Sequence, residues 1–141
     1  MKRRFACIAL ALLLTGCAFG AYQTWADFRN RNSAALANIR IGMTAEQVKE
    51  IMGTASVTGC ELSDGPVCLA TGTRTNPAYT SAVIGSDGKS YMAWMYYTSY
   101  CEGGLRTLAC HTPVVFQDGR VVGWGTEYLS AAKLDLSIHY A

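Results

Sequence analysis

Sixteen residues at the start of the chain are expected to be removed before it folds. Lys2-Arg3-Arg4 is followed by an apolar run from Phe5 to Leu14. This run is too short for a permanent transmembrane helix, which needs about 20 apolar residues. A basic start followed by a short apolar run and small residues is typical of a bacterial export signal. The sequence therefore predicts a cleaved signal peptide over residues 1–16 and an exported chain of 125 residues after it.

Leu14-Thr15-Gly16-Cys17 resembles the lipobox of bacterial lipoproteins. The resemblance implies cleavage before Cys17 and acylation of that cysteine; the alternative is an ordinary secretory signal that contains a cysteine. Two or more acyl chains give stable membrane attachment. Ala18 stands where an aspartate usually retains Gram-negative lipoproteins on the inner membrane. We therefore expect a lipid-anchored outer-membrane protein whose domain faces the periplasm.

The remaining chain divides into a tether and one small domain. Residues 17–34 carry scattered aromatic side chains without a clear period, which predicts a lipidated cysteine and a tether; residues 35–141 then form a single α+β domain. Loss of the signal leaves nine basic residues against ten acidic ones, a net charge of −1. No basic patch remains that would indicate a nucleic-acid partner.

Four cysteines remain in the domain, and an even number in an exported domain indicates two disulfides. Three pairings are possible, and the turn-rich segments between neighbouring cysteines favour Cys60–Cys68 and Cys101–Cys110. A zinc site that also uses His111 is disfavoured, because zinc ribbons pair cysteines only two to four residues apart. The chain lacks a Cys-x-x-Cys redox motif. We expect no metal and no cofactor.

Local patterns predict helices first and strands afterwards. Thr44 and Gln47 form a capping box that begins a helix, which Gly53 ends. A turn of helix over residues 34–39 precedes it. Residues 90–100 predict a central strand, because both of its faces are apolar. One or two short strands are expected within 56–70, and a long loop over 71–89.

Asp118-Gly119 predicts a tight hairpin, because a type I′ turn needs positive φ at both central positions. In the register that this turn implies, Val114 lies opposite Gly123. One face, which carries Val114, Phe116, Val121 and Gly123, is expected to meet the helix, and Trp124 and Val122 lie on the other face. The predicted fold class is α+β, with short N-terminal helices on one face of a small antiparallel sheet.

The segment Ile41 to Val48, followed by Ile51-Met52-Gly53-Thr54, resembles the start of the SmpA/OmlA (BamE-like) domain of outer-membrane lipoproteins. The run from Thr112 to Gly125 looks like the terminal hairpin of a related lipoprotein family with the same layout. The resemblance implies an α+β fold and a role in outer-membrane assembly or integrity. The chain differs from that domain in its four additional cysteines and its longer middle region.

Few residues offer catalytic chemistry. Ser130-Ala131-Ala132-Lys133 matches Ser-x-x-Lys, but the Ser-Asp-Asn and Lys-Thr-Gly elements of penicillin-binding proteins are missing. His111 and His139 lie beside no convincing nucleophile. Aromatic side chains instead indicate an interaction surface, because exposed aromatic residues are frequent interface anchors. The candidate surface consists of Trp94, Tyr96 and Trp124.

These observations favour a non-enzymatic envelope lipoprotein whose domain binds another envelope protein. The expected partners are the membrane, through the lipid anchor, and that protein; no nucleic acid and no small-molecule substrate are expected. The alternative is a small periplasmic inhibitor or ligand-binding module of the same fold.

Overall fold

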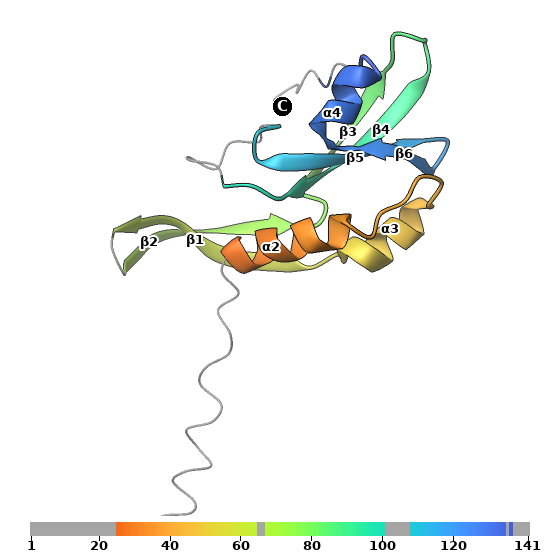
Figure 1. Ribbon diagram of the computed structural model, residues 1–141. Coiled ribbons are helices and arrows are strands. Elements are labelled where there is room, and N and C mark those ends of the chain that lie inside the picture. The colour runs from red at the N-terminus through yellow and green to blue at the C-terminus, as the bar shows by residue number, and fades with distance from the viewer. Residues whose placement is uncertain (1–24, 65–66, 101–107, 135, 137–141) are drawn as a thin grey trace, which may run out of the picture.

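The computed structural model describes residues 25–64, 67–100, 108–134 and 136. Two helices come first, α2 (Trp25–Leu36) and α3 (Ala45–Met52), and a hairpin of β1 (Ser56–Asp64) and β2 (Val67–Thr75) follows. The second sheet has the order β3-β4-β5-β6, formed by β3 (Tyr79–Ile84), β4 (Ser90–Tyr97), β5 (His111–Gln117) and β6 (Arg120–Trp124). A short helix, α4 (Gly125–Ala131), comes last (Figure 1). The α+β class is confirmed.

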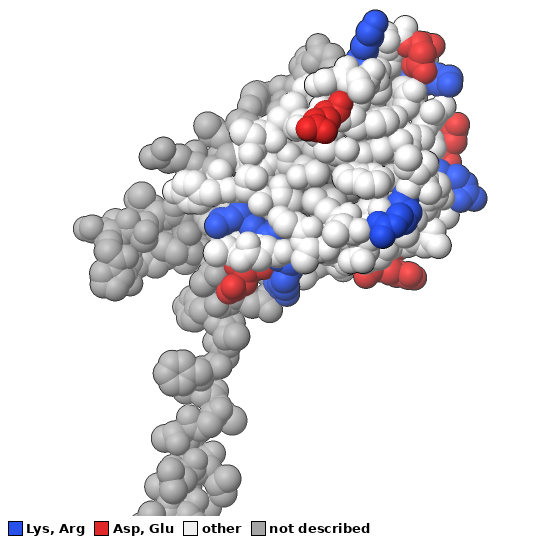
Figure 2. Space-filling model, in the orientation of Figure 1, with Lys and Arg blue, Asp and Glu red and all other residues white. Residues whose placement is uncertain are grey.

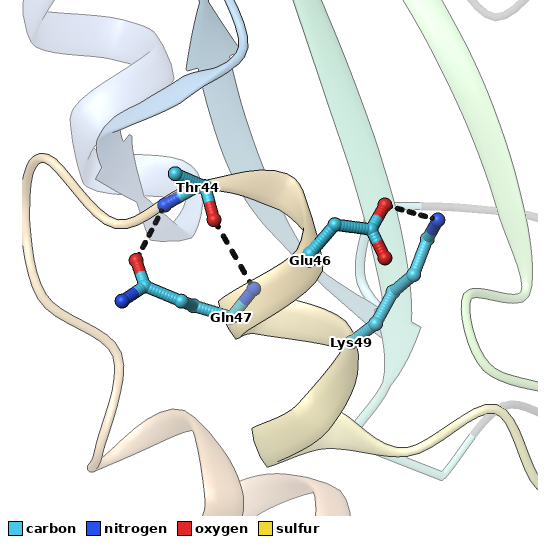
Figure 3. Close-up of polar contacts among 4 residues, drawn as sticks. All are labelled: Thr44, Glu46, Gln47 and Lys49. Carbon is cyan, nitrogen blue, oxygen red and sulfur yellow. Dashed lines mark hydrogen bonds and ion pairs between the residues drawn. The ribbon is translucent and has the colours of Figure 1, made fainter.

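Helix α3 begins as the sequence predicts. The Gln47 amide donates to Thr44 Oγ1 at 3.3 Å, and the Thr44 amide donates back to Gln47 Oε1 at 2.9 Å (Figure 3). These bonds satisfy two amides that a helix start would otherwise leave unpaired. Gly53 ends the helix with a positive φ of 71° and donates to Lys49 O. Local chemistry alone therefore defines both ends of α3.

The domain begins earlier in the chain than expected. The predicted tether over residues 17–34 is wrong from Trp25 onward, because α2 is helical from Trp25 to Leu36. The predicted turn of helix over 34–39 is right for residues 34–36, which lie in α2, and wrong beyond Leu36. Phe28, Asn32 and Leu36 are buried at a spacing of four residues and form one face of α2. The polar Asn32 interrupts this stripe in the sequence, which hides the helix from hydrophobic periodicity. A tether can extend only to the residue before Trp25.

Strand β4 is central, as predicted, and its two faces belong to different cores. Tyr96 packs with Val114, Phe116 and Val121 against residues of α2 and α3. On the opposite face, Ala93 and Met95 pack with Val115, Val83 and residues from α4 onward. Helices α2 and α3 therefore cover one face of the sheet, as expected. Helix α4 and the residues after it cover the other face, so the domain has a second layer that the sequence prediction lacked.

The hairpin of β5 and β6 forms, with a change in register. Asp118 and Gly119 have φ values of 50° and 74°, as a type I′ turn requires. Beyond Phe116 and Val121, a bulge shifts the pairing, so that Val115 lies opposite Gly123 and Val114 opposite Trp124. The predicted pairing of Val114 with Gly123 is therefore wrong.

This shift changes what Gly123 contacts. A side chain at Gly123 would collide with the ring of Tyr128 in α4, so this glycine permits close approach of α4 and not of α3. Val122 packs in the same layer. The domain itself therefore covers the face of the hairpin on which Val122 lies.

The middle of the chain is more regular than predicted. The strands expected within 56–70 are present as β1 and most of β2. The predicted loop over 71–89 is wrong, because β2 continues to Thr75 and β3 occupies Tyr79–Ile84. Threonine, serine and alanine conceal the alternation of β3, whose burial pattern shows a single fully buried position, Val83. Among the described residues, no helix is long and apolar enough to span a bilayer.

Candidate functional site

Tyr96 is not part of an interaction surface. Its side chain is 0% exposed and lies in the core beneath α2 and α3. Its hydroxyl has no hydrogen-bond partner among the residues that the structure describes, and burial raises the pKa of this phenol well above its usual range. The prediction that Tyr96 contacts a partner is therefore wrong. Side chains alternate between the two faces of β4, and Tyr96 points to the face that α2 and α3 cover. These helices bury its side chain completely.

Trp94 lies at the boundary between core and surface. It is half-buried, with its ring centroid 4.7 Å from that of Phe116. From α3, Lys49 places its Nζ 5.6 Å from the Trp94 ring centroid while it forms an ion pair with Glu46 at 2.9 Å (Figure 3). A cation over an aromatic face is a favourable contact. Helix α3 thus covers one part of Trp94 and leaves the other part at the surface.

Next to Trp94, the sheet presents apolar side chains that the described residues do not cover. Ile84 is 68% exposed and Met92 is 40% exposed. Ala82 is also exposed and pairs directly with Met92, so these side chains share one face of the sheet. We call this surface the β3–β4 patch, and it consists of Ala82, Ile84, Met92 and Trp94.

The opposite face of the same strands is well covered. Val83 and Ala93 alternate with the patch residues and are 7% and 2% exposed in the core beneath α4. Exposure is therefore specific to the side that α2 and α3 only partly cover. Isolated exposed apolar residues are ordinary, but a contiguous group on one sheet face is typical of interaction sites.

The patch also borders a sheet edge. Strand β3 is the first strand of the order β3-β4-β5-β6, and within the described part of the chain no strand pairs with its outer side. An edge strand offers backbone amides and carbonyls to an added strand. The β3–β4 patch therefore combines apolar side chains with unpaired backbone groups, which is the chemistry of strand addition by a peptide.

Trp124 belongs to a separate surface. It is 36% exposed and lines a cleft of about 540 Å³ with Thr98, Thr112 and the first residues of α4. Val114 pairs with both Trp94 and Trp124 and is fully buried between them. Because directly paired residues share a face of the sheet, Trp94 and Trp124 lie on the same face, with the buried Val114 between them. The prediction that Trp124 lies on the face opposite Val114 is therefore wrong. Of the predicted surface residues, only Trp94 lies in the patch.

The residues considered for catalysis occupy structural positions. His111 is 3% exposed, and its ring centroid lies 5.2 Å from that of Tyr79 and 5.6 Å from that of Tyr97. The Ser130 hydroxyl donates to Thr126 O in its own helix at 3.2 Å. Lys133 lies beyond the end of α4 with a φ of 51°, and its amide donates to Ser130 O at 3.2 Å. His139 lies outside the described residues. No group of three or more potential metal ligands occurs among the residues described.

The cysteines are only partly described. Cys110 is fully buried and disulfide-bonded, and it packs with Phe28, Val57 and Tyr97. Cys17 and Cys101 lie outside the described residues.

The two cysteines of the other predicted disulfide, Cys60 and Cys68, lie in the neighbouring strands β1 and β2. Cys60 lies opposite Thr71 and Cys68 opposite Ser63, an offset of three residues. The pairing of the four cysteines of the domain therefore stays a prediction.

Comparison with known proteins places the chain in one family. No curated protein and no solved structure matches it. A family model described as "Protein of unknown function (DUF3192)" matches residues 12–131, which include the lipobox, both sheets and α4. This match covers most of the 141 residues. The chain therefore belongs to the DUF3192 family.

Proposed function

We propose that this protein is a lipid-anchored lipoprotein of the outer membrane whose domain binds another envelope protein without catalysis. The anchor rests on Lys2-Arg3-Arg4, the short apolar run and Leu14-Thr15-Gly16-Cys17. The family match begins at residue 12 and so includes this lipobox. A support function in outer-membrane assembly or integrity follows from the resemblance to the SmpA/OmlA domain.

The β3–β4 patch carries the protein-binding part of the proposal. Ile84 and Met92 are exposed on strands whose other face is packed by α4. Burial of apolar surface contributes roughly 25 cal/mol per Å², so covering these side chains favours association. Trp94 at the rim supplies the type of side chain that dominates many interfaces.

The edge of β3 indicates how a partner would bind. An extended segment of the partner pairs with the outer edge of β3, and alternate side chains of that segment contact the patch. Backbone pairing provides affinity, and the apolar contacts provide selectivity. Because the patch has no charged member, we expect complexes that resist moderate salt.

Site-specific photocrosslinking in native membranes tests this function. A photoreactive residue at Ile84 is expected to give a discrete adduct with an envelope protein, and Met92→Ser is expected to weaken it. The matched control is the same residue at Ser130, which is exposed on α4 at the other face. Equal adducts at Ile84 and Ser130, or an Ile84 adduct that Met92→Ser leaves unchanged, would contradict binding through the patch.

The second candidate is a periplasmic inhibitor or ligand-binding module. The cleft of about 540 Å³ beside Trp124 favours it, because ligand sites are concave and commonly lined by aromatic side chains. A photoreactive residue at Trp124 separates the two candidates. Adducts with a soluble hydrolase at Trp124, and none at Ile84, would favour the inhibitor.

A further inference from the structure

Two arginines and three aromatic rings gather where α2 begins. The Arg74 Cζ lies 4.5 Å from the ring centroids of both Trp25 and Tyr97. From α2, the Arg29 Cζ lies 5.6 Å from the Tyr97 ring and 5.7 Å from that of Tyr100. We call this group the arginine–aromatic cluster. Figure 2 shows basic side chains at this end of the molecule, with acidic ones beside them.

The two guanidinium groups lie over aromatic rings. Within the described part of the chain, no carboxylate forms an ion pair with Arg29 or Arg74. Arg29 donates one hydrogen bond, to the Tyr97 hydroxyl at 3.4 Å. A guanidinium carries five N–H donors in its plane, and a contact through its face leaves these donors available. Two such groups on one aromatic ring form a site suited to phosphate oxygens.

The cluster lies close to the proposed anchor. Trp25 is the first residue of α2, and seven residues separate it from Cys17. Even fully extended, this segment reaches only roughly 25 Å at about 3.3 Å per residue. The start of α2 therefore stays near the bilayer surface whenever Cys17 is anchored, which brings lipid phosphates within reach of the cluster.

The exposed aromatic residue at this end matches the same environment. Tyr100 is 73% exposed and is the most exposed large apolar side chain in the structure's described part. Tyrosine and tryptophan are enriched at the headgroup level of membranes, where their rings are apolar and their polar atoms hydrated. Arginine and tyrosine thus share the surface that the short tether holds toward the bilayer.

We propose that the arginine–aromatic cluster rests on the lipid leaflet that holds the anchor, with Arg29 and Arg74 on lipid phosphates and Tyr100 in the headgroup layer. This inference rests on the proposed lipid anchor. It fixes the orientation of the domain: α2 begins at the membrane. The domain is then oriented, and does not tumble freely on its tether.

Fluorescence quenching by brominated lipids tests the orientation. The full-length mature protein is reconstituted in vesicles of phosphatidylethanolamine and phosphatidylglycerol with bromines near the headgroups. We expect quenching that disappears in Trp25→Phe and persists in Trp124→Phe. Quenching that Trp25→Phe leaves unchanged would overturn the proposal.

Substitutions in the arginine–aromatic cluster provide a second test of the orientation. Arg29→Gln with Arg74→Gln, and separately the exposed Tyr100→Ser, should reduce quenching of Trp25. The matched control is Arg40→Gln with Arg120→Gln, because both arginines bond backbone carbonyls near the start of α3 and the β5–β6 turn. Circular dichroism checks that each variant is folded. Equal quenching in the Tyr100→Ser variant and in the control would contradict the proposal.

Unlipidated Cys17→Ser protein separates this inference from the anchor. Loss of both arginines should weaken its binding to the same vesicles by roughly tenfold, since each basic residue near an anionic surface contributes a several-fold effect. Lipidated protein without Trp25 quenching would refute the orientation and leave the anchor intact. Absence of lipid on Cys17 in the native protein would refute the anchor. Independently, vesicle binding that is equally strong without Arg29 and Arg74 would refute the proposed lipid contact of the arginine–aromatic cluster.

Discussion

Removal of the Asn32 side chain should destabilise the domain more than most core truncations of similar size. Asn32 is 2% exposed and its Nδ2 donates to Asn76 Oδ1 at 3.0 Å and to Tyr97 O at 2.9 Å. Its Oδ1 accepts from Asn76 Nδ2 at 2.7 Å. Asn76 Nδ2 also donates to Met52 O at 2.8 Å. The two amides therefore join α2, the end of α3, the β2–β3 connection and β4.

The magnitude follows from the groups that Asn32→Ala leaves behind. Asn76 Oδ1 and Tyr97 O each lose the Asn32 donor in a buried site. A buried polar group without a partner costs about 1–3 kcal/mol. Allowing for a water that occupies part of the vacated space, we expect the free energy of unfolding to fall by about 2–5 kcal/mol.

Urea unfolding of the mature domain measures this change. The matched control is Asn30→Ala, because Asn30 is exposed on the same helix and its replacement should change stability by less than about 0.5 kcal/mol. A double-mutant cycle with Asn76→Ala should give a coupling energy of about 1–3 kcal/mol. The reasoning is refuted if Asn32→Ala and Asn30→Ala are equally stable, since α2 would then not be fixed by this amide pair.

Three further predictions test other parts of the structure. Tyr96→Phe should raise the free energy of unfolding by about 1 kcal/mol in thermal denaturation, because it removes a buried hydroxyl that has no hydrogen-bond partner in the described part of the chain. A clear loss of stability would mean that the hydroxyl is bonded. Gly123→Ala should cost about 1–3 kcal/mol because of the Tyr128 ring, and Gly123→Ala combined with Tyr128→Ala should recover part of the clash. The Asp87 carboxylate accepts from the Lys89 amide at 3.0 Å and the Tyr91 hydroxyl at 2.9 Å, and the first of these bonds chiefly lowers its pKa from 3.8. The stabilisation of the β3–β4 turn by this carboxylate is complete above the unfolded-state pKa and is lost as the pH falls through the folded-state pKa. NMR titration should therefore give Asp87 a pKa below 3.8, and a pKa above that value would contradict the bonding.

Features set by neighbouring residues were predictable from the sequence. The capping box of α3 needs only Thr44 and Gln47, and the tight turn of the last hairpin needs only Asp118 and Gly119. The two apolar faces of β4 likewise follow from alternation along one strand. Each of these depends on interactions across a few residues, which a single sequence contains in full.

Features set by distant contacts were not predictable. Asn32 is buried because Asn76, 44 residues away, completes its hydrogen bonds. The bulge near Val115 shifts Gly123 against Tyr128, a contact that depends on where α4 packs. The sequence pattern therefore predicts a tether that is too long and a wrong register at one end of the hairpin.

The candidate surface shows the same limit. Alternation along β4 correctly put Trp94 and Tyr96 on one face, but it could not say where α3 ends over that face. Tyr96 lies beneath the helices and Met92 lies beyond them. The exposure of Ile84 and Met92 could have been predicted from their positions near the turn after β3. A layer of short helices covers the end of a sheet less completely than its middle.

The intact mass of the native protein tests the central claim most directly. Protein extracted from membranes should begin at Cys17 and carry the added mass of acyl chains, and Cys17→Ser should move the protein out of the membrane fraction. An unmodified Cys17 in the native protein, or a Cys17→Ser variant that still sediments with membranes, would contradict the proposed lipid anchor.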